Sequence, residues 1–217
     1  VLVDIPKDIQ LAEVQFEPRL VEDANTAQQQ FLPAAALDQA RLLIQNAKRP
    51  IAYIGGGVHM ADAVAELHGF LAQSQMPSVT TLKAMGTVPP SNPYYLGMLG
   101  MHGTQAANLA VQQCDLLICL GARFDDRVTG KLAAFAPDAK VIHIDIDPAE
   151  LHKLRRAECA MLGDLRQLLP AMSVPTHCED WLKHCVSMKQ QHGWRYDHPG
   201  ERIFAPLMPV SYTHLTL

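Results

Sequence analysis

Apolar residues follow two alternating patterns along this chain, and the alternation predicts a succession of strands and helices. Short unbroken apolar runs are typical of buried strands, whereas apolar residues three and four positions apart are typical of one helix face. The expected strands are 51–54, 77–82, 116–120, 140–146 and 158–162. The expected helices are 34–48, 61–75, 104–113 and 179–191, with shorter ones at 128–135, at 148–154, and from 165 to a stop at Pro170.

Strand and helix alternate from residue 34 to about residue 170. This alternation predicts an α/β fold with a parallel sheet and helices on both faces. Residues 85–103 interrupt the pattern, because they contain three prolines and four glycines. We expect a long loop there, and long loops in compact domains are usually functional or disordered. The Met, Leu and Tyr residues of this segment argue against disorder.

The two ends of the chain differ from the central region. Residues 1–33 are interpreted as the last strand of a preceding domain, at 1–5, followed by a linker rich in proline and glutamine. Residues 34–175 form the expected central domain. Residues 176–207 are interpreted as a linker towards a further domain, with one more helix beginning at 202. The last ten residues, MPVSYTHLTL, form an atypical tail at 208–217.

Composition narrows the class of protein. The chain has 217 residues, of which 48% are hydrophobic, and a net charge of −4. The absence of a basic stripe argues against a nucleic-acid partner. No apolar run approaches the ~18 residues of a membrane span. The five cysteines lack the spacing of a disulfide framework, which indicates a reducing compartment, so we expect a cytoplasmic protein.

Polar or glycine-rich groups follow four of the expected strands, and these groups are the first candidates for chemistry. They are Gly55–Gly57, Thr80–Thr81, Gly121–Arg127 and Asp145–Asp147. The carboxyl ends of parallel strands share one edge of a sheet, where ligands bind. Glycine turns and Arg123 could hold a pyrophosphate. Asp145, and Asp164 at a fifth strand end, could accept a hydrogen bond from a ribose or ribityl hydroxyl.

Each of these groups has a plainer interpretation. Gly55–Gly57 fails the dinucleotide fingerprint, because Met60 stands where the last glycine should be. A simple strand-to-helix turn is therefore the alternative. The four charges within 123–127 could pair with one another at the surface. Asp145 and Asp147 could be an acid–base pair, or Asp147 could be a turn residue before Pro148.

Histidines and cysteines raise two further possibilities. His102, in a glycine-rich loop, could act as a base or could be a packing residue. The pairs His177-Cys178 and His184-Cys185 recur seven residues apart, so they share a helix face and a metal site is conceivable. The spacing is not that of a zinc finger, and an ordinary amphipathic helix explains it. We therefore expect no metal ligand in this chain.

Longer motifs make a family resemblance specific. Residues 98–137, and GARFDDRVTG at 121–130 above all, closely resemble the central domain of the catalytic large subunit of acetohydroxyacid synthase (acetolactate synthase). IPKDIQ at 5–10, RPIAYIGGG at 49–57 and KVIHIDIDPAE at 140–150 agree in order and spacing. The resemblance covers residues 1 to about 207 and is closest to a bacterial isozyme.

The resemblance implies a function. The family consists of thiamine-diphosphate enzymes with three α/β domains, which decarboxylate pyruvate and join the two-carbon unit to pyruvate or 2-ketobutyrate. This reaction leads to the branched-chain amino acids isoleucine, valine and leucine. The central domain binds FAD, which undergoes no net redox change. The parent enzyme also needs Mg²⁺, and it forms a homo-oligomer with a small regulatory subunit.

The resemblance also assigns residues. FAD contacts fall on Gly55, Gly56, Gly57, Thr81, Leu82, His102, Gly121, Ala122, Arg123, Asp145, Ile146 and Asp164. Arg127 would hold the carboxylate of the second ketoacid, and Met101 would line the same pocket. Asp125 and Asp126 would orient the two arginines. The domains that bind thiamine diphosphate and Mg²⁺ have no counterpart here, so we expect the isolated chain to be inactive.

Two alternatives remain open from the residues themselves. The first is the NAD-binding domain of a dehydrogenase, against which Met60 argues. The second is a binding module of the same fold that carries no cofactor. The colour of the purified protein and its response to added FAD or NAD distinguish the three possibilities.

Overall fold

A computed structural model describes residues 4–13 and 34–192 of the chain. The chain divides into two units, Val1–Gln30 and Phe31–Leu217. In the first unit a short helix, α1 (Lys7–Gln10), follows Pro6, and Asp4 and Ile5 are not in a strand. The rest of the expected strand 1–5 lies outside the described residues. So do the expected helix at 202 and the tail 208–217.

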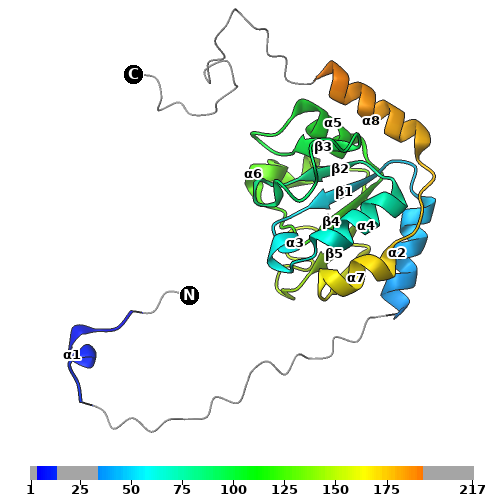
Figure 1. Cartoon of the computed structure of the whole chain (residues 1–217). Coiled ribbons are helices and arrows are strands. Elements are labelled where there is room, and N and C mark those ends of the chain that lie inside the picture. Colours follow the sequence, from blue (N-terminus) through cyan, green and yellow to red (C-terminus); the bar gives the residue numbers. More distant parts are fainter. Residues whose placement is uncertain (1–3, 14–33, 193–217) are drawn as a thin grey trace, which may run out of the picture. The chain divides into compact units, whose positions relative to one another are not determined.

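The second unit is built on a sheet of six parallel strands (Figure 1). The sheet confirms the predicted fold class. The strands are β1 (Pro50–Ile54), β2 (Ser78–Thr80), β3 (Tyr95–Met98), β4 (Leu116–Leu120), β5 (Lys140–Asp145) and β6 (Cys159–Leu162). Their order is β3-β2-β1-β4-β5-β6. The direction of winding therefore reverses between β1 and β4, which is where open α/β sheets form a ligand crevice.

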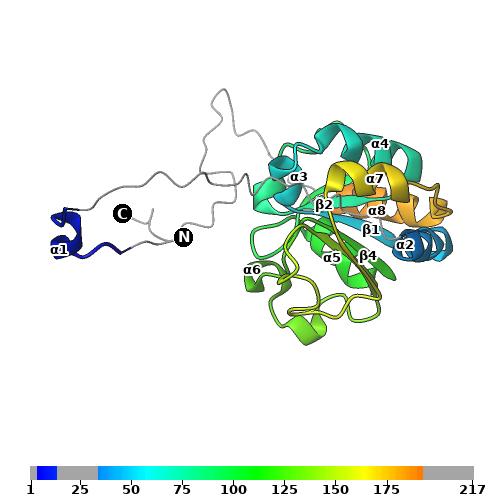
Figure 2. The ribbon, with the colours of Figure 1, turned by 90° about the horizontal axis from the view of Figure 1, so that it is seen from below.

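Helices cover both faces of the sheet (Figures 1 and 2). On one face lie α2 (Ala34–Asn46), α4 (Val64–Ser74) and α7 (Leu165–Met172), and on the other lie α5 (Gln105–Gln113) and α8 (Glu179–Gln191). The central strands β1 and β4 are buried at every position. Burial on both faces is why these strands appear in the sequence as unbroken apolar runs rather than as alternating ones.

Short helical elements occupy the connections. They are α3 (Gly57–Met60), α6 (Asp126–Thr129) and the 3₁₀ turns η1 (Leu82–Ala84) and η2 (Leu132–Ala134). Figures 1 and 2 both show α3 and α6 at the edge towards which β1 points, far from α2. This edge carries the carboxyl ends of all the parallel strands, and we call it the carboxyl edge.

The predicted loop 85–103 is wrong in one respect, because it contains strand β3. Tyr95 pairs with Ser78 and Met98 pairs with Thr80, and the register shifts between these two pairs. The Tyr95 hydroxyl also lies 2.7 Å from Thr80 Oγ1. A four-residue edge strand that contains Gly97 and follows three prolines has too weak a pattern to be recognised from sequence.

Three predicted helices also differ from the structure. The helix expected at 128–135 is replaced by α6 and the separate 3₁₀ turn η2. Residues 148–154 form turns, and His152 has a left-handed φ of 61°, which an α-helix does not contain. Helix α7 does not stop at Pro170 but continues to Met172. Pro170 lies on the exposed side of that helix, where water can satisfy the carbonyl that loses its partner.

All five cysteines are buried free thiols. Within the described ranges no helix combines the length and the apolar character needed to cross a bilayer.

Candidate functional site

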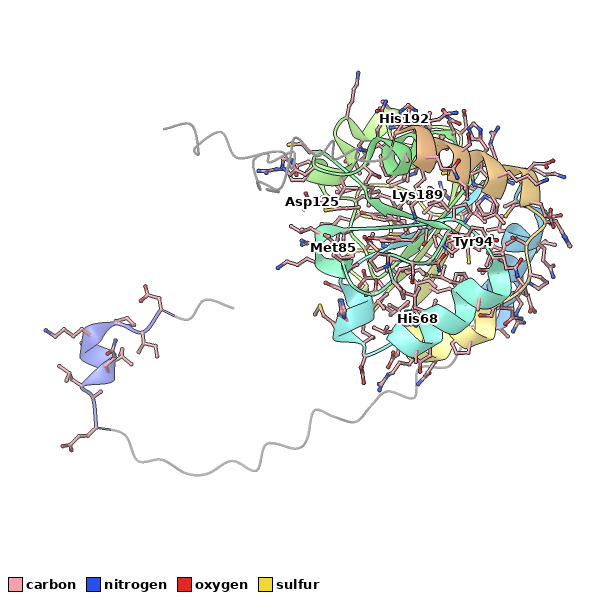
Figure 3. All side chains as sticks on the ribbon, turned by 45° about the horizontal axis from the view of Figure 1, so that its top comes forward. His68, Met85, Tyr94, Asp125, Lys189 and His192 are labelled. Carbon is pink, nitrogen blue, oxygen red and sulfur yellow. The ribbon has the colours of Figure 1, made fainter. Side chains whose placement is uncertain are left out.

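The carboxyl edge gathers the sequence-predicted residues. Six loops leave this edge, one after each parallel strand. Each expected contact residue lies in one of these connections, except Asp145, which is the last residue of β5. Figure 3 shows Met85 and Asp125, which follow β2 and β4, at the same end of the domain. The additional strand β3 explains how the loop around His102 reaches this edge.

The glycine turn after β1 is packed against the turn after β4. A Cβ at Gly55 would lie 2.1 Å from the Gly121 carbonyl oxygen, and one at Gly57 would lie 2.7 Å from Gly121 Cα. The N–H groups of Gly55 and Gly57 donate to the carbonyls of Leu120 and Gly121. These two N–H groups are therefore not available to a phosphate, and glycine is required here for the close approach of two backbones.

Residues 121–127 present their charged side chains outward. Ala122 and Phe124 are buried, whereas Arg123, Asp126 and Arg127 are exposed. Asp125 caps helix α6 by accepting a hydrogen bond from the Arg127 backbone N–H at 3.0 Å. This bond lowers the pKa of the Asp125 carboxyl below its usual value. Asp125 therefore orients Arg127 through the backbone rather than through the guanidinium.

The charges of this loop pair with one another only weakly. Among the described residues this loop forms a single salt bridge, between Arg127 Nε and Asp126 Oδ1 at 3.9 Å, and both side chains are highly exposed. Such a pair contributes little to stability. The guanidinium groups of Arg123 and Arg127 therefore face solvent, and an anion as their ligand stays a prediction.

Met101 and Arg127 are neighbours, although 26 residues separate them in the chain. The Met101 backbone N–H donates to the Arg127 carbonyl at 2.9 Å. Gly100 is buried against α6, since a Cβ there would lie 2.8 Å from the same carbonyl oxygen. His102 is exposed in this loop and does not fill the core. The loops after β3 and β4 thus form one continuous surface.

Thr81 and Leu82 begin the loop after β2. The Thr81 hydroxyl is buried and has no hydrogen-bond partner among the described residues. Leu82 is the opposite case, an apolar side chain exposed to solvent. A buried hydroxyl without a partner is costly in free energy, and one beside an exposed leucine fits a site that is completed by a ligand.

Exposed apolar side chains collect at the carboxyl edge. Six large ones, each 43 to 89% exposed, occur at a strand end or within six residues after it. They form a group that we call the apolar rim: Met60, Leu82, Met85, Met101, Ile146 and Leu162. In the second unit only Leu42 and Leu154, among the described large apolar residues, are comparably exposed elsewhere. Exposed apolar side chains that share one edge of a sheet make that edge a candidate interaction surface.

The acidic residues at the strand ends have different roles. One Asp145 oxygen accepts from the Asp147 N–H at 2.9 Å, and Asp147 in turn accepts from the Ala149 N–H. Asp147 therefore has the bonding of a turn residue, which is one of the two interpretations open from the sequence. Asp164 caps α7 and forms a salt bridge with Arg166 at 2.9 Å, and its pKa is lowered by that guanidinium. The predicted ligand contacts of both Asp145 and Asp164 stay predictions.

Sequence reasoning missed two polar residues inside strands. Tyr53 and His143 are buried beneath the loop 121–127 and bond to its backbone. The signal was present, because each is a polar side chain within an otherwise apolar run, PIAYI and KVIHID. The apolar rim was also only partly anticipated, through Leu82, Met101 and Ile146.

The two cysteines of the histidine–cysteine pairs are buried, whereas both histidines are exposed. Cys178 and Cys185 are buried against the sheet, and the His184 ring stacks on Trp181 at 5.6 Å. In the part of the chain that the structure describes, no three His, Cys, Asp or Glu residues are placed to hold a metal ion. A hollow of about 500 Å³ lies beside these residues, lined also by Lys48 and Arg49 at the opposite edge of the sheet. None of the predicted contact residues lines it.

Comparison with known proteins adds an independent finding. Residues 37–172 match the family described as thiamine pyrophosphate enzyme, central domain. The chain is 57% identical over 208 residues to the acetolactate synthase isozyme 2 large subunit of Escherichia coli strain K12, covering 96% of this chain and 37% of that protein. It is 43% identical to the acetolactate synthase large subunit of Corynebacterium glutamicum, covering 97% and 35%. The chain thus spans little more than a third of the relatives that it matches.

Proposed function

The chain belongs to the family of thiamine pyrophosphate enzyme central domains, and from this premise we propose that it is the FAD-binding domain of an acetolactate synthase large subunit. The observation that carries the proposal is the mixed character of the carboxyl edge. An apolar rim, exposed arginines and a buried hydroxyl without a partner occur together there.

These groups fit the parts of FAD. Its flat apolar ring suits the apolar rim, and its pyrophosphate suits the exposed guanidinium of Arg123. Its ribityl chain offers hydroxyls to the Thr81 hydroxyl and to the free lone pairs of the Asp145 carboxylate. Because two glycine N–H groups are already bonded within the domain, the phosphate contacts rely on Arg123 and on the partly exposed Gly56. Bound FAD would supply no net oxidation or reduction.

Arg127 has a separate role in this proposal. Its guanidinium is exposed, and its backbone carbonyl accepts a hydrogen bond from the Met101 N–H. A forked guanidinium binds a carboxylate with two parallel hydrogen bonds. We assign Arg127 to the carboxylate of the second ketoacid and Met101 to the wall of the same pocket. Arg123 and Arg127 then divide cofactor and substrate between them.

The parent reaction follows from the proposed membership in acetolactate synthase. The complete enzyme would decarboxylate pyruvate with thiamine diphosphate and Mg²⁺ and would join the two-carbon unit to pyruvate or 2-ketobutyrate. It would work in the cytoplasm as a homo-oligomer with a small regulatory subunit. The chain of 217 residues matches only about a third of its relatives, so it should produce no acetolactate by itself.

The cofactor is tested on the purified chain. We expect yellow protein, or colourless protein that quenches the fluorescence of added FAD and releases the flavin on denaturation. Binding of NAD in preference to FAD would instead support a dehydrogenase domain. A chain that folds, as judged by circular dichroism, but binds neither would support a module without a cofactor.

The roles of the two arginines are tested in a chimera in which this chain replaces the matching segment of the Escherichia coli large subunit. Arg127→Gln should keep FAD and lose use of the second ketoacid, whereas Arg123→Gln should weaken FAD binding. Loss of FAD from Arg127→Gln with unchanged ketoacid choice would mean that the two roles are reversed.

A further inference from the structure

Three polar side chains form a row across the centre of the sheet. Tyr53 on β1 is in register with Cys119 on β4, and Cys119 is in register with His143 on β5. All three side chains lie on the sheet face that α5 covers, and each is at most 1% exposed. We call these residues the polar row. Polar groups in such a place cost free energy unless they are hydrogen-bonded.

The polar row bonds to the backbone of the loop above it. The Tyr53 hydroxyl donates to the Arg123 carbonyl at 2.8 Å. His143 Nε2 and Cys119 Sγ both meet the Ala122 carbonyl, at 3.1 and 3.0 Å. Because a carbonyl only accepts, Nε2 must carry the proton of a neutral imidazole. Burial raises the pKa values of Tyr53 and Cys119 well above their usual range, so both remain donors.

These bonds turn two successive carbonyls towards the interior. Phe124, the next residue, follows them inward and lies 5.4 Å from the His143 ring and 6.1 Å from the Tyr53 ring. The two inward carbonyls and the buried Phe124 side chain leave only the outward direction for the Arg123 side chain, which is exposed.

The same anchoring extends to Arg127. Asp125 follows Phe124 directly and caps α6, which fixes the backbone of Arg127. The Arg127 carbonyl then receives the Met101 N–H. A continuous series of contacts therefore runs from the polar row through Phe124 and Asp125 to the residues assigned to the substrate pocket.

We propose that Tyr53 and His143 are positioning residues, which hold the loop 121–127 so that Arg123 meets the anionic part of the cofactor and Arg127 the ketoacid carboxylate. The ligand side of this inference rests on the proposed function. The loop side rests only on the hydrogen bonds and ring contacts of this chain.

A first experiment tests the loop without any ligand. Tyr53→Phe removes one donor and keeps the ring, and its matched control is Trp181→Phe. Trp181 is also a buried aromatic donor to a backbone carbonyl, that of Pro50 at 3.0 Å, but at the opposite edge of the sheet. Hydrogen exchange measured by mass spectrometry should be about fivefold faster in peptides covering 121–130 of Tyr53→Phe, which is the change that one lost hydrogen bond predicts.

The control decides what this result means. Trp181→Phe should lower the melting temperature but leave exchange of 121–130 at the parent rate. Equal exchange of 121–130 in both variants would overturn the proposal, because Tyr53 would then stabilise only the whole domain.

A second experiment tests the ligand side. Tyr53→Phe should raise the FAD dissociation constant about fivefold, and this effect should disappear when Arg123 is already Ala, because a positioning residue acts only through the residue it positions. His143→Leu should behave like Tyr53→Phe, while His143→Gln, which keeps a donor, should restore much of the affinity. A Tyr53→Phe effect that persists in full beside Arg123→Ala would overturn the positioning role.

The two experiments distinguish a failure of the proposed function from a failure of the positioning role. A chain that folds but binds no FAD refutes the proposed function, and the exchange comparison then decides the positioning role alone. Normal exchange in Tyr53→Phe, with FAD bound by the parent chain, refutes the positioning role and leaves the proposed function standing.

Discussion

One added methyl group should have opposite effects at two glycines of this domain. At Gly55 a Cβ would lie 2.1 Å from the Gly121 carbonyl oxygen and 2.4 Å from Ala122 Cα, and neither backbone atom can move without displacing a turn. At Gly69, on the exposed side of α4, a Cβ would meet nothing within 4 Å. Gly55→Ala should therefore cost about 3 kcal/mol or more.

Gly69→Ala is the matched control, because alanine is the better helix former. It should raise the free energy of unfolding by about 0.5–1 kcal/mol. Urea unfolding followed by circular dichroism measures both changes. A Gly55→Ala chain as stable as the parent would show that the two turns can separate, and the close approach of β1 and β4 would then be wrong.

His143 should make the domain less stable as the pH falls below 6.5. Burial lowers its pKa from the usual 6.5, and this outweighs the hydrogen bond to the Ala122 carbonyl and the charges of Asp145 and Glu150, which raise it, while His152 adds to the lowering. The unfolded chain therefore binds a proton in a range where the folded chain does not. The neutral ring contributes its full stability above pH 6.5, and this contribution is lost as the pH falls towards the lowered pKa.

His143→Gln is the variant that isolates this effect. Glutamine keeps a donor for the Ala122 carbonyl but does not titrate. Urea unfolding at pH 7.5, 6.5 and 5.5 should show a smaller loss of stability for His143→Gln than for the parent over this range. Parallel curves would mean that His143 has the same pKa in the folded and unfolded chains.

Sequence predicts the positions of the residues at this site better than their bonding. The glycine turn, the two arginines and the acidic strand ends were all found from their place after apolar runs. The hydrogen bonds from the Gly55 and Gly57 N–H groups to the carbonyls of Leu120 and Gly121 could not be predicted, because they depend on a turn 66 residues away. The support given by Tyr53 and His143 was hidden for the same reason, since it depends on strand register.

Thr104 joins a strand to a helix, and its loss should affect both. Its hydroxyl accepts from the Ala107 N–H at 3.1 Å as the cap of α5, and it donates to the Leu96 carbonyl of β3 at 2.7 Å. Thr104→Ala removes both bonds and should lower the free energy of unfolding by about 2 kcal/mol. Thr104→Ser keeps the hydroxyl and should cost less than about 1 kcal/mol.

Chemical denaturation of the two variants makes the comparison. Equal losses of unfolding free energy in Thr104→Ala and Thr104→Ser would assign the effect to the Thr104 methyl group, which lies against Gly97, and not to the cap. A threonine directly before a helical pattern is a recognisable cap in the sequence. Strand β3 was not predicted, so the sequence offered no partner for the second hydrogen bond of Thr104.

Elements were predicted where local pattern and tertiary packing agree. The strand 116–120 and the helix 179–191 have their predicted bounds, because each has a continuous apolar run or a single apolar face. The helix expected at 148–154 is absent, and His152 within that segment has a left-handed φ of 61°, which an α-helix does not contain. A backbone conformation of this kind is not visible in hydrophobic periodicity.

At the scale of the molecule, the alternation of strand and helix predicted the parallel sheet, and the sheet predicted a common edge for its loops. The strand order could not be derived, because it depends on which way each helix crosses the sheet. The order places the reversal of winding between β1 and β4, beneath the Gly55 and Gly121 turns. The apolar rim around this point is the feature that the whole fold assembles and no single motif reveals.

If the apolar rim covers the ring of FAD, then FAD should stabilise the domain. A leucine on the rim should then contribute more to this stabilisation than a similarly exposed leucine elsewhere. FAD at 100 times its dissociation constant should add about 2.7 kcal/mol, which raises the melting temperature of a domain of this size by roughly 5–10 °C. Leu82→Ser on the rim should weaken binding about tenfold and reduce that shift by about half. Leu42→Ser, on α2 and similarly exposed (60% against 69%), should leave the shift unchanged. Differential scanning fluorimetry with and without FAD measures all three chains, and an equal loss of the shift in both variants would show that FAD does not bind at the rim.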